Sequence, residues 1–237
     1  MFDTLGHVVM KPFMLAWLYL SPHSWLGLPL PEAGPPVVVA GPQPQRILLC
    51  GSGIVVGYGV TSHELALGGA LARSLAALTR RGVEVATIAA PRLSTKTARA
   101  RLTGDVLEGL DAVVLSFGSF DILTFLPARK WSQGMGELVD CVLSQTSSST
   151  QVFIVNCVAP KMSNFTPAYR RHLVVMTDAY NDEVKALTQK SERVHQINFA
   201  PEPKDAELIE GRQSYRTWAD ALTPTIANEL RGHQLGA

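Results

Sequence analysis

Five short apolar runs alternate with helical stretches between residues 46 and 231, and this alternation constrains the fold more than any other feature of the sequence. The runs are rich in Val, Ile and Leu, and they cover residues 47–50, 83–89, 112–117, 152–157 and 194–199. Continuous apolar strands are typical of a parallel sheet that helices cover on both faces. The alternation therefore predicts an α/β fold, a three-layer α/β/α sandwich with a mostly parallel five-stranded sheet.

Three longer helices are expected around these strands. The first begins at Thr61, where Glu64 completes a capping box, and it ends at Gly82. Leucines at helical spacing form its apolar face: Leu67, Leu71, Leu75 and Leu78. The second helix starts at Pro167, and the third runs from about residue 214 to 230. The apolar repeat of the second helix is Leu173, Met176, Tyr180, Val184 and Leu187.

The first 45 residues differ in composition from the rest and predict two further segments. Residues 8–30, "VVMKPFMLAWLYLSPHSWLGLPL", are dense in Leu, Trp, Phe and Tyr, but their uninterrupted apolar run is too short to span a bilayer. We interpret residues 1–28 as a hydrophobic arm that packs over the domain or acts as a lid; the alternative is a segment that lies in a membrane interface. Residues 29–45 contain six prolines, which predicts an extended connector to a domain at 46–231, followed by a tail at 232–237.

Charge and cysteine content narrow the classes of partner and cofactor. The formal net charge is +1, and the sequence has no block of like charges, so nucleic acid is not expected as a binding partner. Cys50 and Cys157 end apolar strands and are interpreted as core residues, and nothing in the sequence indicates an oxidising compartment. We therefore expect a cytoplasmic protein, with peripheral membrane contact through residues 8–30 as the alternative. No metal-ligand spacing and no dinucleotide-binding loop is present, so no cofactor is expected.

Ligands of parallel α/β sheets bind at the carboxyl ends of the strands, and the motifs at those ends resemble a known family. The stretch "ILLCGSGIVVGYGV" is similar to the first block of the SGNH (GDSL-type) hydrolases, in which a strand ends in Gly-Asp-Ser. The stretch "AVVLSFGSFDILTFLPARKW" is similar to the third block, Gly-x-Asn-Asp, and "SYRTWADALTPTIANEL" to the helix after the last block. The matches follow the family's order over residues 30–231. The resemblance implies a flavodoxin-like sandwich and the chemistry of esterases, lipases and acyltransferases.

The resemblance also implies where a catalytic site would lie, and the residues at those positions differ from the family's. In the family, a first-block serine attacks the acyl carbonyl, a late histidine takes its proton, and an aspartate orients the histidine. Here Gly51 matches the leading glycine, Ser52 replaces the aspartate of that block, and Gly53 replaces the nucleophile. At the last block, Ala206 replaces the orienting aspartate and Ile209 the histidine. In this register no acyl-enzyme can form at position 53.

The groups that hold the oxyanion in the family differ as well. Arg92 stands at the glycine of the second block, and Phe120 replaces the asparagine of the third block, where Gly118 and Asp121 match. The degenerate pocket is expected to be lined by the residues at all these motif positions and by Ser119: Gly51, Ser52, Gly53, Arg92, Gly118, Ser119, Phe120, Asp121, Ala206 and Ile209. Two interpretations of Arg92 and Asp121 remain: a surface ion pair, or an anion-binding arginine whose guanidinium Asp121 holds.

A relocated nucleophile is the main alternative, and Ser52 is its candidate. Ser52 would need a base within hydrogen-bond reach, and none of the six histidines obviously supplies one. The other interpretation of Ser52 is a turn or capping hydroxyl.

The sequence thus predicts an SGNH-hydrolase-fold pseudoenzyme that binds an acyl-bearing, lipid-like or anionic small molecule, or a protein partner. The alternative is an active serine esterase, lipase or acyltransferase that uses Ser52. A third interpretation is a scaffold role without a small ligand. Fold alone does not decide among them.

Overall fold

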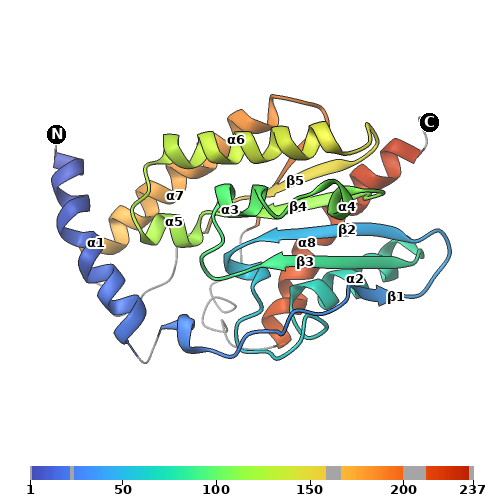
Figure 1. The fold of residues 1–237 in the computed structure, drawn as a ribbon, viewed down its shortest axis with the longest axis horizontal. Helices are drawn as coiled ribbons and strands as arrows, with labels where there is room; N and C mark the ends of the chain where they lie inside the picture. The colour runs from blue at the N-terminus through green and yellow to red at the C-terminus, as the bar shows by residue number, and fades with distance from the viewer. Residues whose placement is uncertain (1, 22–23, 159–166, 200–211, 235–237) are drawn as a thin grey trace.

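The computed structural model describes residues 2–21, 24–158, 167–199 and 212–234, which form an α/β/α sandwich (Figure 1). The sheet has six strands in the order β1-β3-β2-β4-β5-β6. They are β1 (Val37–Val39), β2 (Gln45–Gly51), β3 (Val83–Ala89), β4 (Ala112–Ser116), β5 (Gln151–Val155) and β6 (Val194–Ile197). Strands β2 to β6 are parallel, which confirms the expected mostly parallel sheet and the α/β fold class.

The sheet has one strand more than expected, because β1 lies within the Pro-rich segment 29–45. This strand pairs antiparallel with β3, and Val38 lies opposite Glu84. Consecutive valines favour extended backbone, and the prolines on either side are tolerated because β1 is an edge strand. Part of the predicted connector therefore belongs to the sheet. The division of the chain into arm, connector and domain stays a prediction.

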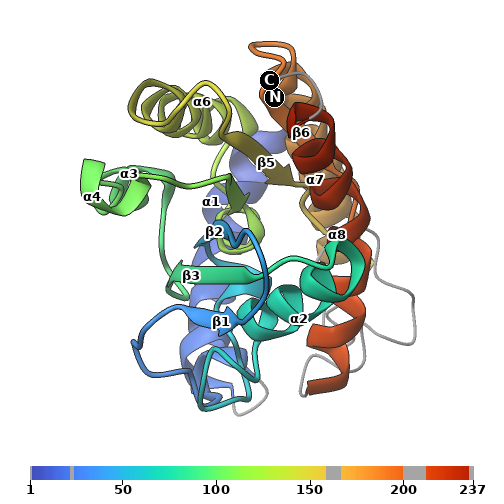
Figure 2. The same ribbon diagram turned by 90° about the vertical axis from the view of Figure 1, so that its right-hand side faces the viewer.

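Helices cover both faces of the sheet. One face carries α2 (Leu67–Thr79) and α8 (Arg212–Gln234), which Figure 2 shows together on one side. The opposite face carries α3 (Thr95–Arg99), α4 (Gly104–Leu107), α5 (Ser119–Leu123), α6 (Ala128–Gln145) and α7 (Pro167–Thr188). Two short 3-10 helices flank the first two strands, η1 (Trp25–Gly27) before them and η2 (Gly53–Val55) after them.

Alternate strand residues divide the core into two halves. In β2, Ile47 and Leu49 pack with α2 and α8, whereas Leu48 and Cys50 belong to the half that α6 and α7 cover. Because each central strand is buried on both faces, its sequence is apolar at consecutive positions. The five apolar residues predicted for the second helix are all buried in α7. Of the four leucines predicted to face the core from the first helix, Leu78 is instead exposed.

The boundaries predicted for the first helix are wrong at both ends. Helix α2 begins at Leu67 rather than at Thr61. The preceding turn folds back onto the helix at Gly69, where a Cβ would collide with the main chain of that turn. The helix then ends before Arg80, which adopts the left-handed conformation (φ 59°), rather than at Gly82. Gly82 already leads into β3, so the helix has to end earlier.

The N-terminal arm forms helix α1 (Phe2–Leu20), which lies at the end of the molecule toward which the arrows of β2 and β3 point (Figure 1). Met14 and Leu18 are completely buried in the core half under α5 and α6. Trp17 packs edge-on against Trp25, with ring centroids 5.8 Å apart. The Ser24 hydroxyl donates to the Leu18 carbonyl at 2.6 Å. None of the described helices is both long and apolar enough to cross a bilayer.

Candidate functional site

The carboxyl ends of the parallel strands lie at the same end of the sheet as α1 (Figure 1). The loops that follow β2, β3 and β4 carry the described residues of the predicted site, which are Gly51, Ser52, Gly53, Arg92, Gly118, Ser119, Phe120 and Asp121. Ala206 and Ile209, the positions of the family's late aspartate and histidine, lie outside the described residues. The geometry of the site is therefore built from the first three loops.

The loop after β2 turns Ser52 inward. Gly51 has φ 153° and lies so close to β4 that a Cβ would collide with the carbonyl oxygen of Ser116. The Ser52 amide donates to that same oxygen at 2.8 Å. Ser52 is 1% exposed, and its hydroxyl has no hydrogen-bond partner in the described part of the chain. Ser52 precedes η2, but its side chain forms no capping hydrogen bond there. The structure therefore does not show the capping role that the sequence suggested for this hydroxyl.

Gly53 and Ser119 bring the loops after β2 and β4 into contact. Gly53 has φ 72°, a left-handed conformation that favours glycine. A Cβ at position 53 would lie 2.9 Å from the Ser119 hydroxyl oxygen. The Ser119 hydroxyl thus stands beside the point from which the family's nucleophile would project. The sequence did not reveal this contact, because the two residues lie far apart in the chain.

The first residues of α5 pack directly onto the core. Gly118 has φ 117°, and a Cβ there would collide with the Cys157 sulfur. Burial raises the pKa of the Asp121 carboxyl to about 6. Burial and, to a lesser extent, the charge of Asp121 raise the pKa of the Cys157 thiol and of the Tyr180 phenol, so the carboxyl lies near both groups. With a pKa near 6, Asp121 can either accept or donate a hydrogen bond close to neutral pH.

Phe120 gives this edge of the sheet an apolar character. Its ring is half-buried and packs against the core half under α6 and α7. Leu93 and Phe117, which follow β3 and β4, are buried in the same cluster. An asparagine side chain at position 120 would offer a polar donor, whereas phenylalanine offers only apolar surface and its ring edge.

The structure separates Arg92 from Asp121. Arg92 is exposed, and its guanidinium carbon lies 4.5 Å from the centroid of the Tyr19 ring of α1. The ion pairs formed among the described residues do not include Arg92 or Asp121. The ion pair that both interpretations required is therefore absent. The Arg92 guanidinium instead contacts an aromatic face that α1 offers beside the loop after β3.

The arm also contacts the loop after β2. Pro29, the first residue of the predicted connector, accepts a hydrogen bond of 2.9 Å from the Gly59 amide. Burial raises the pKa of the Tyr58 phenol in this loop, and a hydrogen bond from Trp25 offsets part of the shift. Residues of the arm therefore lie against the loops after both β2 and β3. This arrangement is what a packing arm or lid would produce.

The described histidines do not serve as a base for either serine of the site. Neither Ser52 nor Ser119 forms a hydrogen bond with an imidazole of the described part of the chain. Burial lowers the pKa of His63, which lies in the turn before α2. His172 stacks on an aromatic ring at 5.4 Å, and His195 forms a hydrogen bond of 2.8 Å with a glutamine of β5. Within the described ranges, no group of three or more His, Cys, Asp or Glu side chains is placed to hold a metal ion.

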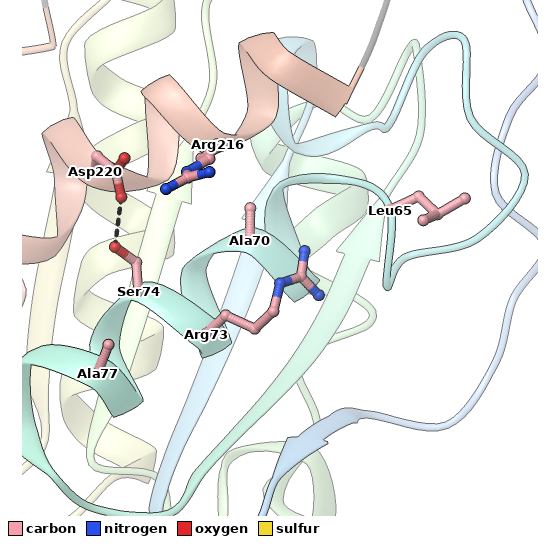
Figure 3. A pocket seen from close by; sticks show the side chains of 7 residues that line it. All are labelled: Leu65, Ala70, Arg73, Ser74, Ala77, Arg216 and Asp220. Carbon is pink, nitrogen blue, oxygen red and sulfur yellow. Dashed lines mark hydrogen bonds between the residues drawn. The ribbon is translucent and has the colours of Figure 1, made fainter.

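A second candidate region is a groove between α2 and α8, on the other face of the sheet (Figure 3). Its volume is about 560 Å³, and it is lined by Leu65, Ala70, Arg73, Ser74, Ala77, Arg216 and Asp220. The Ser74 hydroxyl donates to the Asp220 carboxylate at 2.6 Å and links the two helices (Figure 3). Arg73 donates to a carbonyl oxygen of the preceding turn at 3.1 Å. Because its charged side chains are exposed and of both signs, we interpret this groove as a packing seam between helices.

Comparison with known proteins relates the fold to ester hydrolases. No protein-family model matches the sequence, and no curated protein matches it. Among solved structures, the chain is similar to the lipase Lip_vut3 from a goat rumen metagenome, with a TM-score of 0.60 and 14% identity over 80% of this chain and 97% of that chain. It is also similar to a lipase/acylhydrolase from Enterococcus faecalis, with a TM-score of 0.55 and 18% identity over 78% and 96% of the two chains. A member of the lipolytic protein G-D-S-L family from Veillonella parvula gives a TM-score of 0.55 and 13% identity over 79% and 97%. The likeness shows that the chain has an SGNH-hydrolase-like fold, as its motifs predict.

Proposed function

We propose that this protein is a binding protein built on the SGNH-hydrolase fold, without the serine chemistry of that fold's enzymes. The observation that carries the proposal is the loop after β2. Position 53 has no side chain, and the neighbouring Ser52 hydroxyl is buried without a hydrogen-bond partner among the described residues. The predicted alternative that uses Ser52 as nucleophile is not supported by this geometry.

A covalent route through Ser52 would need two conditions that the loop does not meet. The hydroxyl has to be open to an ester carbonyl, and a base has to lie within hydrogen-bond reach to take its proton. Ser52 is 1% exposed, and its hydroxyl has no hydrogen bond to an imidazole within the ranges that the structure describes. The members of a catalytic triad act as a unit, so a site that lacked both the nucleophile and the base would have no covalent mechanism.

We propose an acyl-bearing or lipid-like ligand for the carboxyl edge of the sheet. The half-buried Phe120 of α5 offers apolar surface there, and it packs on a core cluster to which the buried Leu93, Met14 and Leu18 belong. Binding sites for apolar ligands are lined by such residues with a small number of polar groups that orient the ligand. The Asp121 carboxyl and the Ser119 hydroxyl are candidates for the polar groups. A protein partner at the same edge is the other form of this proposal.

A second candidate function is ester hydrolysis by Ser119. The observation that favours it is the 2.9 Å distance between the Ser119 hydroxyl oxygen and a Cβ position at residue 53, which places this hydroxyl beside the family's nucleophile position. Against it stands the lack of a hydrogen bond from Ser119 to any described histidine. Hydrolysis of p-nitrophenyl butyrate by the full chain separates the two candidates. We expect no turnover above the buffer rate. Turnover that Ser119→Ala abolishes and Ser52→Ala leaves intact would establish the second candidate.

Ligand binding is tested with a fluorescent long-chain fatty acid as the probe. We expect saturable binding to the full chain, and Phe120→Asn should weaken it about thirtyfold, because about 2 kcal/mol of apolar contact is lost. The matched control is Val38→Asn, which changes an exposed side chain of the edge strand β1. Equal affinity in the wild type, Phe120→Asn and the control would contradict a ligand site at this edge.

A further inference from the structure

Helix α1 presents a second apolar face that no described residue covers. Its inner side chains, Met14 and Leu18, are completely buried. On the outer side, Phe13 is 70% exposed and Leu20 is 81% exposed. Tyr19 lies between these two faces and is half exposed. Residues 12–20 of α1 are apolar on all sides. A helical segment of this kind is normally buried on all sides, so its outer face is expected to meet an apolar partner.

Exposed cations occur in α1 itself and in three segments that lie at the same end of the molecule. The first turns of α6 and α7 lie at the same end of the molecule as α1 (Figure 1), and the loop after β3 reaches α1 through Arg92. No acidic residue occurs in residues 11–20, 128–136 or 167–177. None of the exposed cations of these segments forms an ion pair with a described residue. They are Lys11, Arg92, Arg129, Lys130, Arg170 and Arg171.

We infer that this end of the molecule, the outer face of α1 together with the exposed cations of these segments, docks on the surface of an anionic lipid bilayer. The apolar side chains would enter the boundary between headgroups and acyl chains, while the cations contact lipid phosphates and carboxylates. Arginine stems extend along apolar surface and keep the charged group in the polar layer. The inference goes beyond the proposed function, since it holds whether or not the carboxyl edge of the sheet binds an acyl ligand.

The charge pattern selects a lipid surface over a second copy of this chain. In a two-fold dimer through α1, both copies would bring the same excess of positive charge to one interface, and the like charges would repel. An anionic bilayer instead provides an apolar interior for the side chains of α1 and negatively charged headgroups for the cations. The contact between Arg92 and Tyr19, with the guanidinium 4.5 Å from the ring centroid, suits the interface, where aromatic rings and cations anchor proteins at the headgroup level.

The inference is tested by co-sedimentation of the full chain with phosphatidylcholine vesicles that contain or lack about one-third phosphatidylserine. We expect binding to the anionic vesicles, weaker binding to the neutral ones, and a fall in binding as salt is raised. The apolar variant, Phe13→Ser with Leu20→Ser, should bind on the order of a hundredfold more weakly. The charge variant, Arg170→Gln with Arg171→Gln, should bind about thirtyfold more weakly to anionic vesicles alone.

Matched controls use exposed residues on other surfaces. Val38→Ser with Leu78→Ser removes exposed apolar side chains from β1 and α2, and Arg73→Gln with Arg216→Gln removes two exposed cations from the α2–α8 groove. Both control variants should bind as the wild type does, and unchanged circular dichroism and melting temperature establish that each variant is folded. Absence of binding to anionic vesicles at low salt would overturn the inference. It would also be overturned by a dimer that the apolar variant dissociates, which would assign the face to a second copy.

Discussion

Asp121 places a carboxyl group in a half-buried position, and replacing it by the isosteric amide gives a stability change whose sign and pH dependence follow from the structure. Burial raises the pKa of this carboxyl from 3.8 to about 6 in the folded protein. Each pKa unit corresponds to about 1.4 kcal/mol, so the ionised carboxylate destabilises the fold by up to about 3 kcal/mol above pH 6. Because water reaches part of the side chain, we expect Asp121→Asn to raise the free energy of unfolding by about 1 to 3 kcal/mol near pH 7.5.

The sign of this stability change follows from the protons that Asp121 binds in the folded and in the unfolded state. Between about pH 4 and pH 6 the folded state holds the Asp121 proton and the unfolded state has lost it. The wild type therefore loses stability as pH rises through this window, and the variant does not. Urea denaturation of both proteins across this pH range measures the difference, which should be small near pH 4 and reach its full size above pH 6. Asp178→Asn, which alters an exposed carboxylate of α7, is the control and should show no such dependence. A variant that is less stable than the wild type at pH 7.5 would show instead that hydrogen bonds or cations favour the ionised form of Asp121.

The remaining predictions concern packing and thiol reactivity. Gly118→Ala should destabilise the fold by more than about 3 kcal/mol in urea denaturation, because a Cβ there meets Cys157 in a left-handed backbone conformation; a loss below about 1 kcal/mol would contradict the close packing. Leu18→Ala should cost about 2 to 5 kcal/mol, and an unchanged unfolding midpoint would show that the arm is not part of the core. In the native protein, iodoacetamide should label Cys141 and spare Cys50, because burial raises the pKa of the Cys50 thiol to about 12. Peptide mapping after labelling of the native protein measures this, and a modified Cys50 would count against it.

Much of the sheet was predictable because its signal is local. A strand buried on both faces has apolar residues at consecutive positions, and β3 occupies the predicted range 83–89 without change. Strand β1 was missed because three valines between prolines carry a weak local signal, and its partner β3 lies far along the chain. The start of α2 was misplaced because Thr61 and Glu64 have capping-box spacing, whereas the observed turn depends on tertiary contact at Gly69.

The candidate site was predictable in its positions but not in its contacts. The motif spacing placed Gly51 and Gly53 at the end of β2, and both adopt positive φ values there. The inward direction of Ser52 depends on how the loop packs against β4. Ser119 lies close to position 53, and Arg92 contacts α1. Both contacts depend on the packing of segments that are far apart in the sequence, so no local pattern could predict them.

The central claim is that no hydroxyl of this site acts as an acyl-accepting nucleophile. Intact-mass spectrometry of the full chain after incubation with an alkyl fluorophosphonate tests it most directly, since such reagents form a stable adduct with serines that a neighbouring base activates. We expect an unchanged mass, equal to that of the untreated protein. A single stoichiometric adduct that disappears in Ser52→Ala or in Ser119→Ala would contradict it.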